Sequence, residues 1–277
     1  MSQTSLAPWM LYDAYRNGPH TAVGEMRVLP GLYSPQLDNR RDVLVYLPPR
    51  HGTDARRFPV LYMHDGQNLF DQGTAFGGNE WQVDETLELL SAEGLPAIAV
   101  GLPNSGAGRI PEYSPFPGFA EPRGERYLAF LIETVKPLID AAFRTEPGRE
   151  HTGLIGSSMG GLISLYGYFR YPEVFGLAGA LSPALWYTRG AIYDFVAKAP
   201  FVPGKIYLDN GSRENSASRM EQLLIEKGYQ AGRDLLYVVE PGGRHTETAW
   251  ARRLPGALRF LLSGHAAHRH ATTAEQD

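Results

Sequence analysis

The sequence predicts an α/β fold in which a mostly parallel, twisted β-sheet is covered by helices on both faces. Short apolar segments rich in Val, Ile and Tyr alternate with longer segments of helical periodicity over most of the 277 residues. Most of the apolar segments are nearly continuous, which is typical of strands buried on both faces of a parallel sheet. A chain of this length commonly forms a single α/β domain.

The N-terminal half begins with two predicted strands that no helix separates. They are TAVGEMRVLPGLYS (21–34) and RDVLVYLPP (41–49), and their direct succession indicates an antiparallel start to the sheet. We expect residues 1–20 to form an N-terminal extension. Further strands are expected over 58–66 and 95–104, with a helix between them over 79–94.

The second half of the chain alternates between helices and strands. A helix predicted over 124–144 contains Pro137, which is expected to kink or divide it. The remaining elements are strand 151–157, helix 159–170, strands 175–183 and 204–211, helix 216–228, strand 234–243 and helix 246–264. Together these elements predict one domain over residues 1–264.

Two segments depart from this alternation. Residues 104–124 are rich in Gly and Pro and include three aromatic residues, so we expect a long, ordered active-site loop. Arg109 and Glu112 are expected to hold this loop in place through ion pairing, although Arg109 and Arg123 would also suit an anionic substrate. Residues 265–277 lack apolar periodicity and are expected to form a flexible tail.

Composition narrows the class of protein. A formal net charge of −4 and the lack of a Lys/Arg block argue against a nucleic-acid partner. The chain has no cysteine, so disulfides and thiolate chemistry are excluded. We find no signal-peptide pattern and no long apolar run, and therefore expect a cytoplasmic protein without a membrane span. No metal-binding or nucleotide-binding motif is present, so no metal and no cofactor are expected. The oligomeric state stays open.

The segment LIGSSMGG (154–161) contains the pattern Gly156-x-Ser158-x-Gly160. A Gly-rich chain often contains this pattern by chance, so the elements that flank it decide whether it marks a catalytic serine. Here an apolar strand precedes Ser158 and a predicted helix follows it, as a nucleophile elbow requires. We therefore expect Ser158 to be a catalytic nucleophile.

A serine nucleophile needs a base and an acid, which follow it in the order serine, acid, histidine when the serine lies on such an elbow. Four histidines follow Ser158, and three of them lie in the predicted tail, which leaves His245 as the base. Asp209 and Glu214 both fit the position of the acid. Glu214 is favoured because it lies on the loop after a strand, and Asp209 remains the alternative.

Acyl transfer also requires donors for the oxyanion that forms during attack. We expect the backbone N–H groups of Met159 and Gln67 to form this oxyanion hole, with Gly66 as the alternative to Gln67. The aromatic residues of the neighbouring loops suggest an apolar pocket for an acyl or aryl group. Trp186, Phe116 and Phe119 are the expected substrate-binding residues.

The chain resembles the putative esterase family of α/β-hydrolases, which includes esterase D-like enzymes, feruloyl esterases and enterochelin esterases. The resemblance covers residues 40–262 and rests on the stretches FPVLYMHDGQNLFD, IGSSMGG, LSPALW, YLDNGSREN and GGRHTETAWARRLPGALRFL. It implies the α/β-hydrolase fold, Ser158 as nucleophile, His245 as base and Glu214, three residues after Gly211, as acid. Members of the family differ in whether this acid is Asp, Glu or absent.

The expected function is that of a serine carboxylesterase that hydrolyses a small-molecule ester through a Ser-His-Glu triad and an acyl-enzyme. One alternative is an acyltransferase, which uses the same triad with an alcohol acceptor in place of water. The other is a non-catalytic protein that keeps the α/β-hydrolase fold and binds a ligand in the aromatic cleft.

Overall fold

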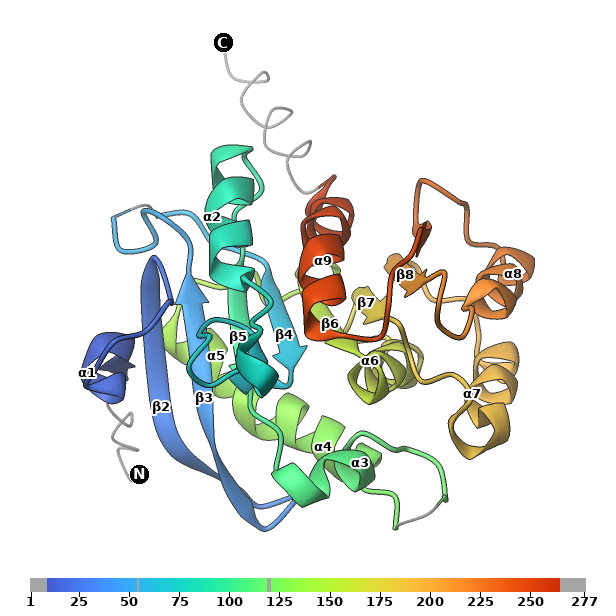
Figure 1. Cartoon of the computed structure of the whole chain (residues 1–277), viewed down its shortest axis with the longest axis horizontal. Coiled ribbons are helices and arrows are strands. Elements are labelled where there is room, and N and C mark those ends of the chain that lie inside the picture. Colours follow the sequence, from blue (N-terminus) through green and yellow to red (C-terminus); the bar gives the residue numbers. More distant parts are fainter. Residues whose placement is uncertain (1–8, 54, 119–120, 265–277) are drawn as a thin grey trace.

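A computed structural model describes residues 9–53, 55–118 and 121–264. The nine strands in this part of the chain join one sheet in the order β1-β2-β3-β5-β4-β6-β7-β8-β9 (Figure 1). The strands are β1 (Met10–Leu11), β2 (Glu25–Ser34), β3 (Asn39–Leu47), β4 (Val60–His64), β5 (Ile98–Leu102), β6 (Thr152–Ser157), β7 (Leu177–Leu181), β8 (Lys205–Gly211) and β9 (Leu235–Glu240).

The sheet changes direction at β5. Strands β1, β2, β3 and β5 pair antiparallel, whereas β5, β4, β6, β7, β8 and β9 are all parallel. This arrangement confirms the expected fold class, including the antiparallel N-terminal strands. Because all the parallel strands from β4 to β8 end at the same edge, the loops that follow them meet there.

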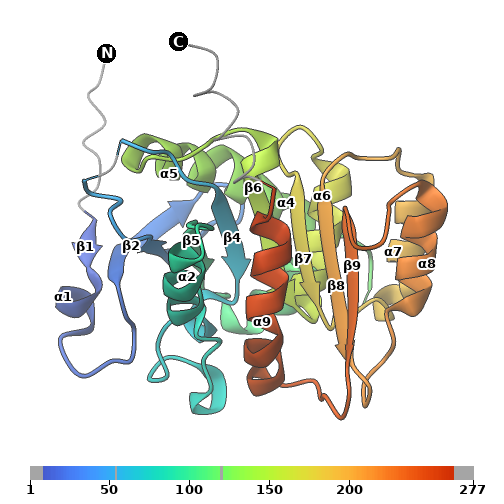
Figure 2. The same ribbon diagram turned by 90° about the horizontal axis from the view of Figure 1, so that it is seen from above.

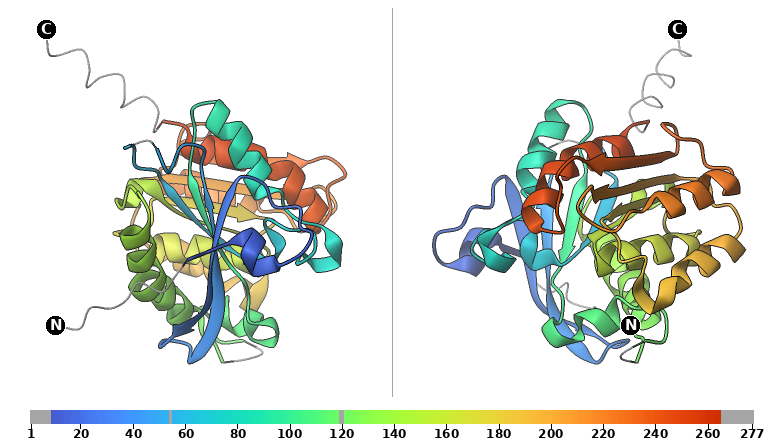
Figure 3. Two further views of the ribbon diagram at one scale, coloured as in Figure 1. Left: turned by 90° about the vertical axis from the view of Figure 1, so that its left-hand side faces the viewer. Right: turned by 45° about the vertical axis from the view of Figure 1, so that its right-hand side comes forward.

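Helices cover both faces of the sheet (Figures 2 and 3). Alternate residues of β4 show the reason: Val60 and Tyr62 join one hydrophobic core, and Leu61 and Met63 join the other. One core contains residues of α2 (Val83–Ala92) and α9 (Glu247–Leu262). The opposite core contains residues of α4 (Gly124–Phe130), α5 (Lys136–Ala142), α6 (Met159–Arg170), α7 (Tyr187–Lys198) and α8 (Ser218–Lys227).

Several elements differ from the sequence predictions. The helix predicted over 124–144 is divided near Pro137, as one of the two expected outcomes, but through a π-helical turn, Leu131–Val135. This turn joins α4 to α5 and leaves Pro137 in the first turn of α5. Helix α7 was not predicted, since its first turn contains Gly190 and left-handed backbone, which obscure helical periodicity. The predicted tail and the first eight residues lie outside the described residues.

Residues 9–20 of the predicted extension pack onto the antiparallel edge of the sheet. They form β1 and the short helix α1 (Tyr12–Arg16), and the buried Tyr12 hydroxyl donates to Asp71 at 2.8 Å. Among the described helices, none has the length and hydropathy needed to cross a bilayer.

Two ion pairs anchor the 104–124 segment at the short helix α3 (Arg109–Glu112). Arg109 forms a bidentate pair with Asp65, with both N···O distances 2.7 Å. Glu112 pairs with Arg41 of β3 at 2.9 Å, and both of these side chains are almost fully buried. The predicted anchoring role of Arg109 and Glu112 is thus confirmed, and it ties this segment to the sheet edge.

Substitution Glu112→Gln is expected to lower the free energy of unfolding by about 3 kcal/mol, because it leaves the Arg41 guanidinium buried without a counter-charge. Urea unfolding followed by circular dichroism measures this change. Glu93→Gln is the matched control, since it breaks an ion pair with Arg259 that is exposed to solvent. Equal shifts in the two variants would contradict the proposed importance of the buried pair.

Asp84, in the first turn of α2, is expected to make stability depend on pH. Its fully buried carboxyl accepts the Val23 N–H at 2.6 Å, and burial raises the pKa of Asp84 to about 8. The folded state therefore binds more protons than the unfolded state, whose Asp pKa is about 3.9, so this group's contribution to stability falls as pH rises from about 4 to 8.

Asp84→Asn keeps an oxygen for Val23 and removes the titration. Urea midpoints measured at pH 5 and pH 9 should fall more in the wild type than in this variant. An identical pH dependence of the urea midpoint in the two proteins would show that Asp84 does not titrate in this range.

Candidate active site

Ser158 lies in a sharp turn between β6 and α6. Its backbone has φ 55° and ψ −118°, a conformation that residues other than glycine seldom adopt. Three backbone hydrogen bonds hold the turn: the Ser158 N–H donates to Leu181, and the Ser158 carbonyl accepts from Leu162 and Ala184. The hydroxyl-bearing residue is partly exposed, as a nucleophile must be.

The glycines around Ser158 are required by close packing. A Cβ on Gly156 would lie 2.8 Å from both the Gly160 carbonyl carbon and His64 Cδ2, and one on Gly161 would lie 3.1 Å from Pro183 Cβ. The Gly-rich sequence therefore allows α6 to begin directly against the end of β6.

His245 and Glu214 meet at the carboxyl edge of the sheet. Their loops follow β9 and β8, and His245 Nδ1 lies 2.7 Å from Glu214 Oε2. The Glu214 side chain is 4% exposed, whereas that of His245 is 46% exposed. The acid is thus held inside the protein and the imidazole reaches the surface, where its other nitrogen is accessible.

Glu214 is held by contacts on both sides of its carboxylate. Oε1 accepts the Gly211 N–H at 2.8 Å and the Ser182 hydroxyl at 3.1 Å. Arg253, on α9, lies with Nη1 3.7 Å from Oε1 and also donates to Ser182 Oγ at 2.7 Å. Trp250 donates to the same Ser182 oxygen at 3.0 Å, and its ring meets the His245 ring edge-on with centroids 5.0 Å apart.

Ser182, Trp250 and Arg253 were not predicted from the sequence. A signal for the last two existed, because Trp250 and Arg253 are three residues apart on the buried side of the helix that follows His245. An arginine on the buried face of an amphipathic helix usually has an acidic partner. Ser182 carried no comparable pattern.

Asp209, the alternative acid, has a different set of partners. It accepts the Ser182 N–H at 2.8 Å and the Tyr207 hydroxyl at 3.0 Å, and it pairs with Arg253 Nε at 2.9 Å. Burial raises the pKa of Asp209 to about 6. The structure records no contact between Asp209 and His245, so the geometry favours Glu214 as the acid.

Ser158 and His245 both follow parallel strands at the carboxyl edge of the sheet, but the structure records no hydrogen bond between the Ser158 hydroxyl and the imidazole. Such bonds are often long in free hydrolases and shorten when substrate binds. The acid–base pair is therefore in contact in this state, and the nucleophile–base pair is not.

The expected oxyanion donors lie at the starts of two helical turns. Met159 is the first residue of α6, where N–H groups have no partner within the helix. Gln67 lies in a 3-10 turn, Gly66–Asn68, and its N–H has no hydrogen-bond partner among the described residues. Its side chain instead accepts the Asn104 N–H at 3.1 Å, which links this turn to the 104–124 segment.

His64 and Asp65 directly precede the 3-10 turn that contains Gln67, and the contacts of their side chains hold this part of the chain in place. The Asp65 backbone is left-handed (φ 56°), and its carboxylate binds Arg109 and Asn104. His64 Nδ1 lies 2.7 Å from the Tyr127 hydroxyl, and burial lowers the pKa of His64 to about 3. His64 is thus a neutral packing residue and not a second base.

The three aromatic residues expected to bind substrate have different surroundings. Trp186 is 58% exposed and lines a pocket of about 380 Å³ with Pro117 and Arg189. Phe116 is half-buried and packs edge-on against Tyr166, which gives it a packing role. Phe119 lies outside the described residues. Within the described ranges, no group of three His, Asp or Glu residues could hold a metal ion.

A family model and several curated relatives match this sequence. The family model described as "Putative esterase" matches residues 34–261. The protein YbbA of Bacillus subtilis is 27% identical over 80% of this chain and 92% of its own length. The iron(III) enterobactin esterase of Dickeya dadantii is 26% identical over 83% of this chain, which spans 54% of that protein.

Solved structures share the fold. The enterobactin esterase of Shigella flexneri, crystallised in the presence of enterobactin, has a TM-score of 0.70 at 20% identity and covers 88% of this chain, which covers 60% of that one. The ferulic acid esterase AmCE1/Fae1A of Anaeromyces mucronatus has a TM-score of 0.63 at 22% identity, with coverage of 97% and 95%. Since the family model spans most of the chain and solved esterases share its fold, this chain belongs to the putative esterase family of α/β-hydrolase-fold enzymes that act on ester bonds.

Proposed function

We propose that the protein is a serine carboxylesterase whose triad is Ser158, His245 and Glu214. The observation that carries the proposal is the 2.7 Å contact between His245 and the buried Glu214, on loops at the same sheet edge as the strained Ser158 turn. A serine on a strained strand-to-helix turn, with a histidine–carboxylate pair at the same sheet edge, is the arrangement that activates a hydroxyl for attack on a carbonyl.

In the first half of the reaction, Ser158 Oγ forms a bond to the ester carbonyl carbon while its proton passes to His245 Nε2. Glu214 accepts the Nδ1–H, keeps the imidazole in the correct tautomer and stabilises the imidazolium that forms. The N–H groups of Met159 and Gln67 stabilise the oxyanion. The alcohol then leaves with the proton from His245, and an acyl-enzyme remains.

In the second half, a water molecule gives its proton to His245 and attacks the acyl carbon. The bond to Ser158 Oγ breaks, the serine regains the proton, and the carboxylic acid is released. An acyltransferase would use an alcohol at this step, so product analysis with added methanol distinguishes the two reactions. Trp186 is the residue that we propose to contact the substrate.

Substitution Ser158→Ala is expected to abolish covalent labelling by a fluorophosphonate and to lower kcat/KM for 4-nitrophenyl esters by at least about 10³-fold, because the nucleophile is lost. Intact-mass spectrometry shows the adduct. Ser157→Ala is the matched control, since it removes the neighbouring hydroxyl from a buried position and should keep the adduct. Labelling of the Ser158→Ala variant, or no labelling of the folded wild type, would refute the proposal.

Substitution Glu214→Gln is expected to lower kcat by roughly 10³–10⁴-fold with little change in KM, since the amide cannot stabilise the imidazolium. Glu240→Gln is the control, because Glu240 pairs with Arg253 at 2.9 Å without contacting His245. Steady-state kinetics on both variants test the assignment. If Asp209→Asn folds normally and loses turnover while Glu214→Gln keeps it, Asp209 is the acid.

A further inference from the structure

A pocket of about 420 Å³ is lined by residues of two segments that are linked to the proposed triad. One wall is the segment Pro183–Trp186, whose Ala184 N–H donates to the Ser158 carbonyl at 2.9 Å. The other wall includes Asn215, which directly follows Glu214. The pocket is therefore linked to Ser158 by a backbone hydrogen bond and to Glu214 through the next residue of the chain.

The lining of this pocket is cationic and contains no carboxylate. Arg189 and Arg219 both line it, together with Pro183, Trp186 and Tyr193. Throughout the described ranges, no Asp or Glu oxygen lies within 4 Å of either guanidinium in an ion pair.

Several other arginines of the chain form ion pairs. Arg41, Arg109 and Arg253 each pair with a buried carboxylate. The chain as a whole also carries a net charge of −4. Arg189 and Arg219 thus bring two guanidinium groups without an ion pair into one pocket of an acidic protein. A guanidinium binds carboxylate oxygens in a fixed, two-pronged geometry.

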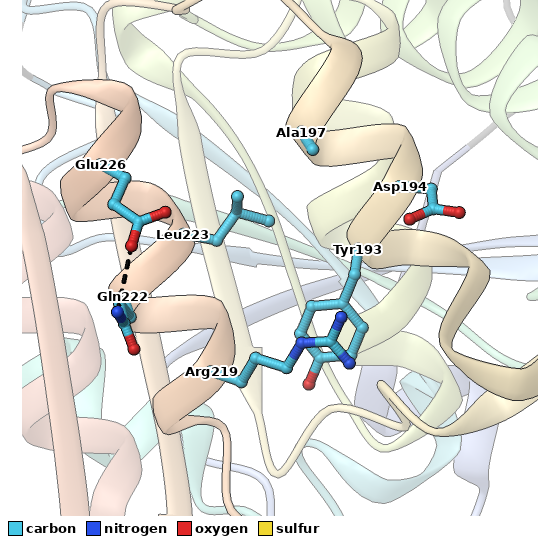
Figure 4. A pocket seen from close by; sticks show the side chains of 7 residues that line it. All are labelled: Tyr193, Asp194, Ala197, Arg219, Gln222, Leu223 and Glu226. Carbon is cyan, nitrogen blue, oxygen red and sulfur yellow. Dashed lines mark hydrogen bonds between the residues drawn. The ribbon is translucent and has the colours of Figure 1, made fainter.

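Packing orients the Arg219 side chain. Its guanidinium carbon lies 4.1 Å from the centre of the Tyr193 ring, so α8 and α7 hold it between them. Figure 4 shows this stack from a neighbouring pocket, with Asp194 projecting away from Arg219 and Glu226 directed towards Gln222. The nearby acidic residues thus leave the guanidinium edge free for a ligand.

Arg189 is placed by unusual backbone. Thr188, Arg189 and Gly190 have φ values of 48°, 58° and 77°, so two residues with side chains adopt the left-handed conformation in succession. This conformation costs free energy at each of them, and such strain is concentrated at binding and catalytic sites. It puts Arg189 at the junction of this pocket and the one lined by Pro117 and Trp186.

We infer that Arg189 and Arg219 bind a carboxylate group of the ester substrate, while Pro183 and Trp186 contact the apolar part between that group and the ester bond. This inference rests on the proposed esterase function and names the class of substrate, an ester that carries a negative charge.

The test uses two matched ester pairs. One pair is 4-nitrophenyl 4-carboxybenzoate and its neutral carboxamide, which put the charge on the acyl side. The other is 4-carboxyphenyl benzoate and its carboxamide, which put it on the alcohol side. The acid should exceed its carboxamide in kcat/KM by at least 10-fold in one pair.

Arg189→Gln and Arg219→Gln should each reduce this preference several-fold, and the double variant should abolish it. In each variant the kcat/KM of the acid should fall more than that of its carboxamide, which separates charge recognition from damage to the site. Arg233→Gln is the matched control, since Arg233 precedes β9 at the opposite edge of the sheet and should keep the full preference.

Equal rates within both pairs, or a preference that survives in the double variant, would overturn the inference. Hydrolysis of the neutral esters together with Ser158 labelling would leave the proposed function intact in that case. If no ester is hydrolysed and Ser158 is not labelled, the proposed function fails. The inference is then tested by measuring the affinities of 2-naphthoate and 2-naphthamide through tryptophan fluorescence. Tighter binding of the acid than of the amide, lost in the double variant, supports the inference. Equal affinities refute it.

Discussion

The turn at Ser158 is the constraint on which the active edge of this protein depends. The positive φ of Ser158 occurs where α6 starts directly against the end of β6, and that contact leaves no room for a Cβ at Gly156. The same turn is bonded to the ends of neighbouring segments, through Leu181 and Ala184. The strain at one residue is therefore supported by the sheet and by the loop after β7, which also forms a wall of the cationic pocket.

The region around Glu214 and His245 depends on a second feature, the buried guanidinium group of Arg253. Arg253 of α9 contacts Ser182, Asp209 and Glu240 and lies near Glu214. Buried carboxylates are costly without a counter-charge, and this single side chain supplies one to residues from β8, β9 and the following loops. Helix α9 thus does more than cover the sheet, because it also fixes the acid that contacts His245.

Much of the fold and part of the site could be predicted from the sequence. The order of strands and helices follows from hydrophobic periodicity, which each segment carries locally, and the antiparallel start follows from two strands without an intervening helix. The π-helical turn before Pro137 and the left-handed turn in α7 were missed, since both depend on how the segment packs and not on its periodicity. Phe116 was expected in the substrate pocket, but its ring packs against Tyr166.

For the site itself, the sequence by itself determined the elbow pattern at Ser158, the position of His245 in the chain and the two carboxylates that could serve it. Only the tertiary structure shows that Glu214, and not Asp209, contacts His245, because both lie within a few residues of the end of β8. It also showed that Arg189 and Arg219, which lie on different helices, share one pocket. Distances between loops that follow different strands are set by strand order and packing, and no local pattern of residues encodes them.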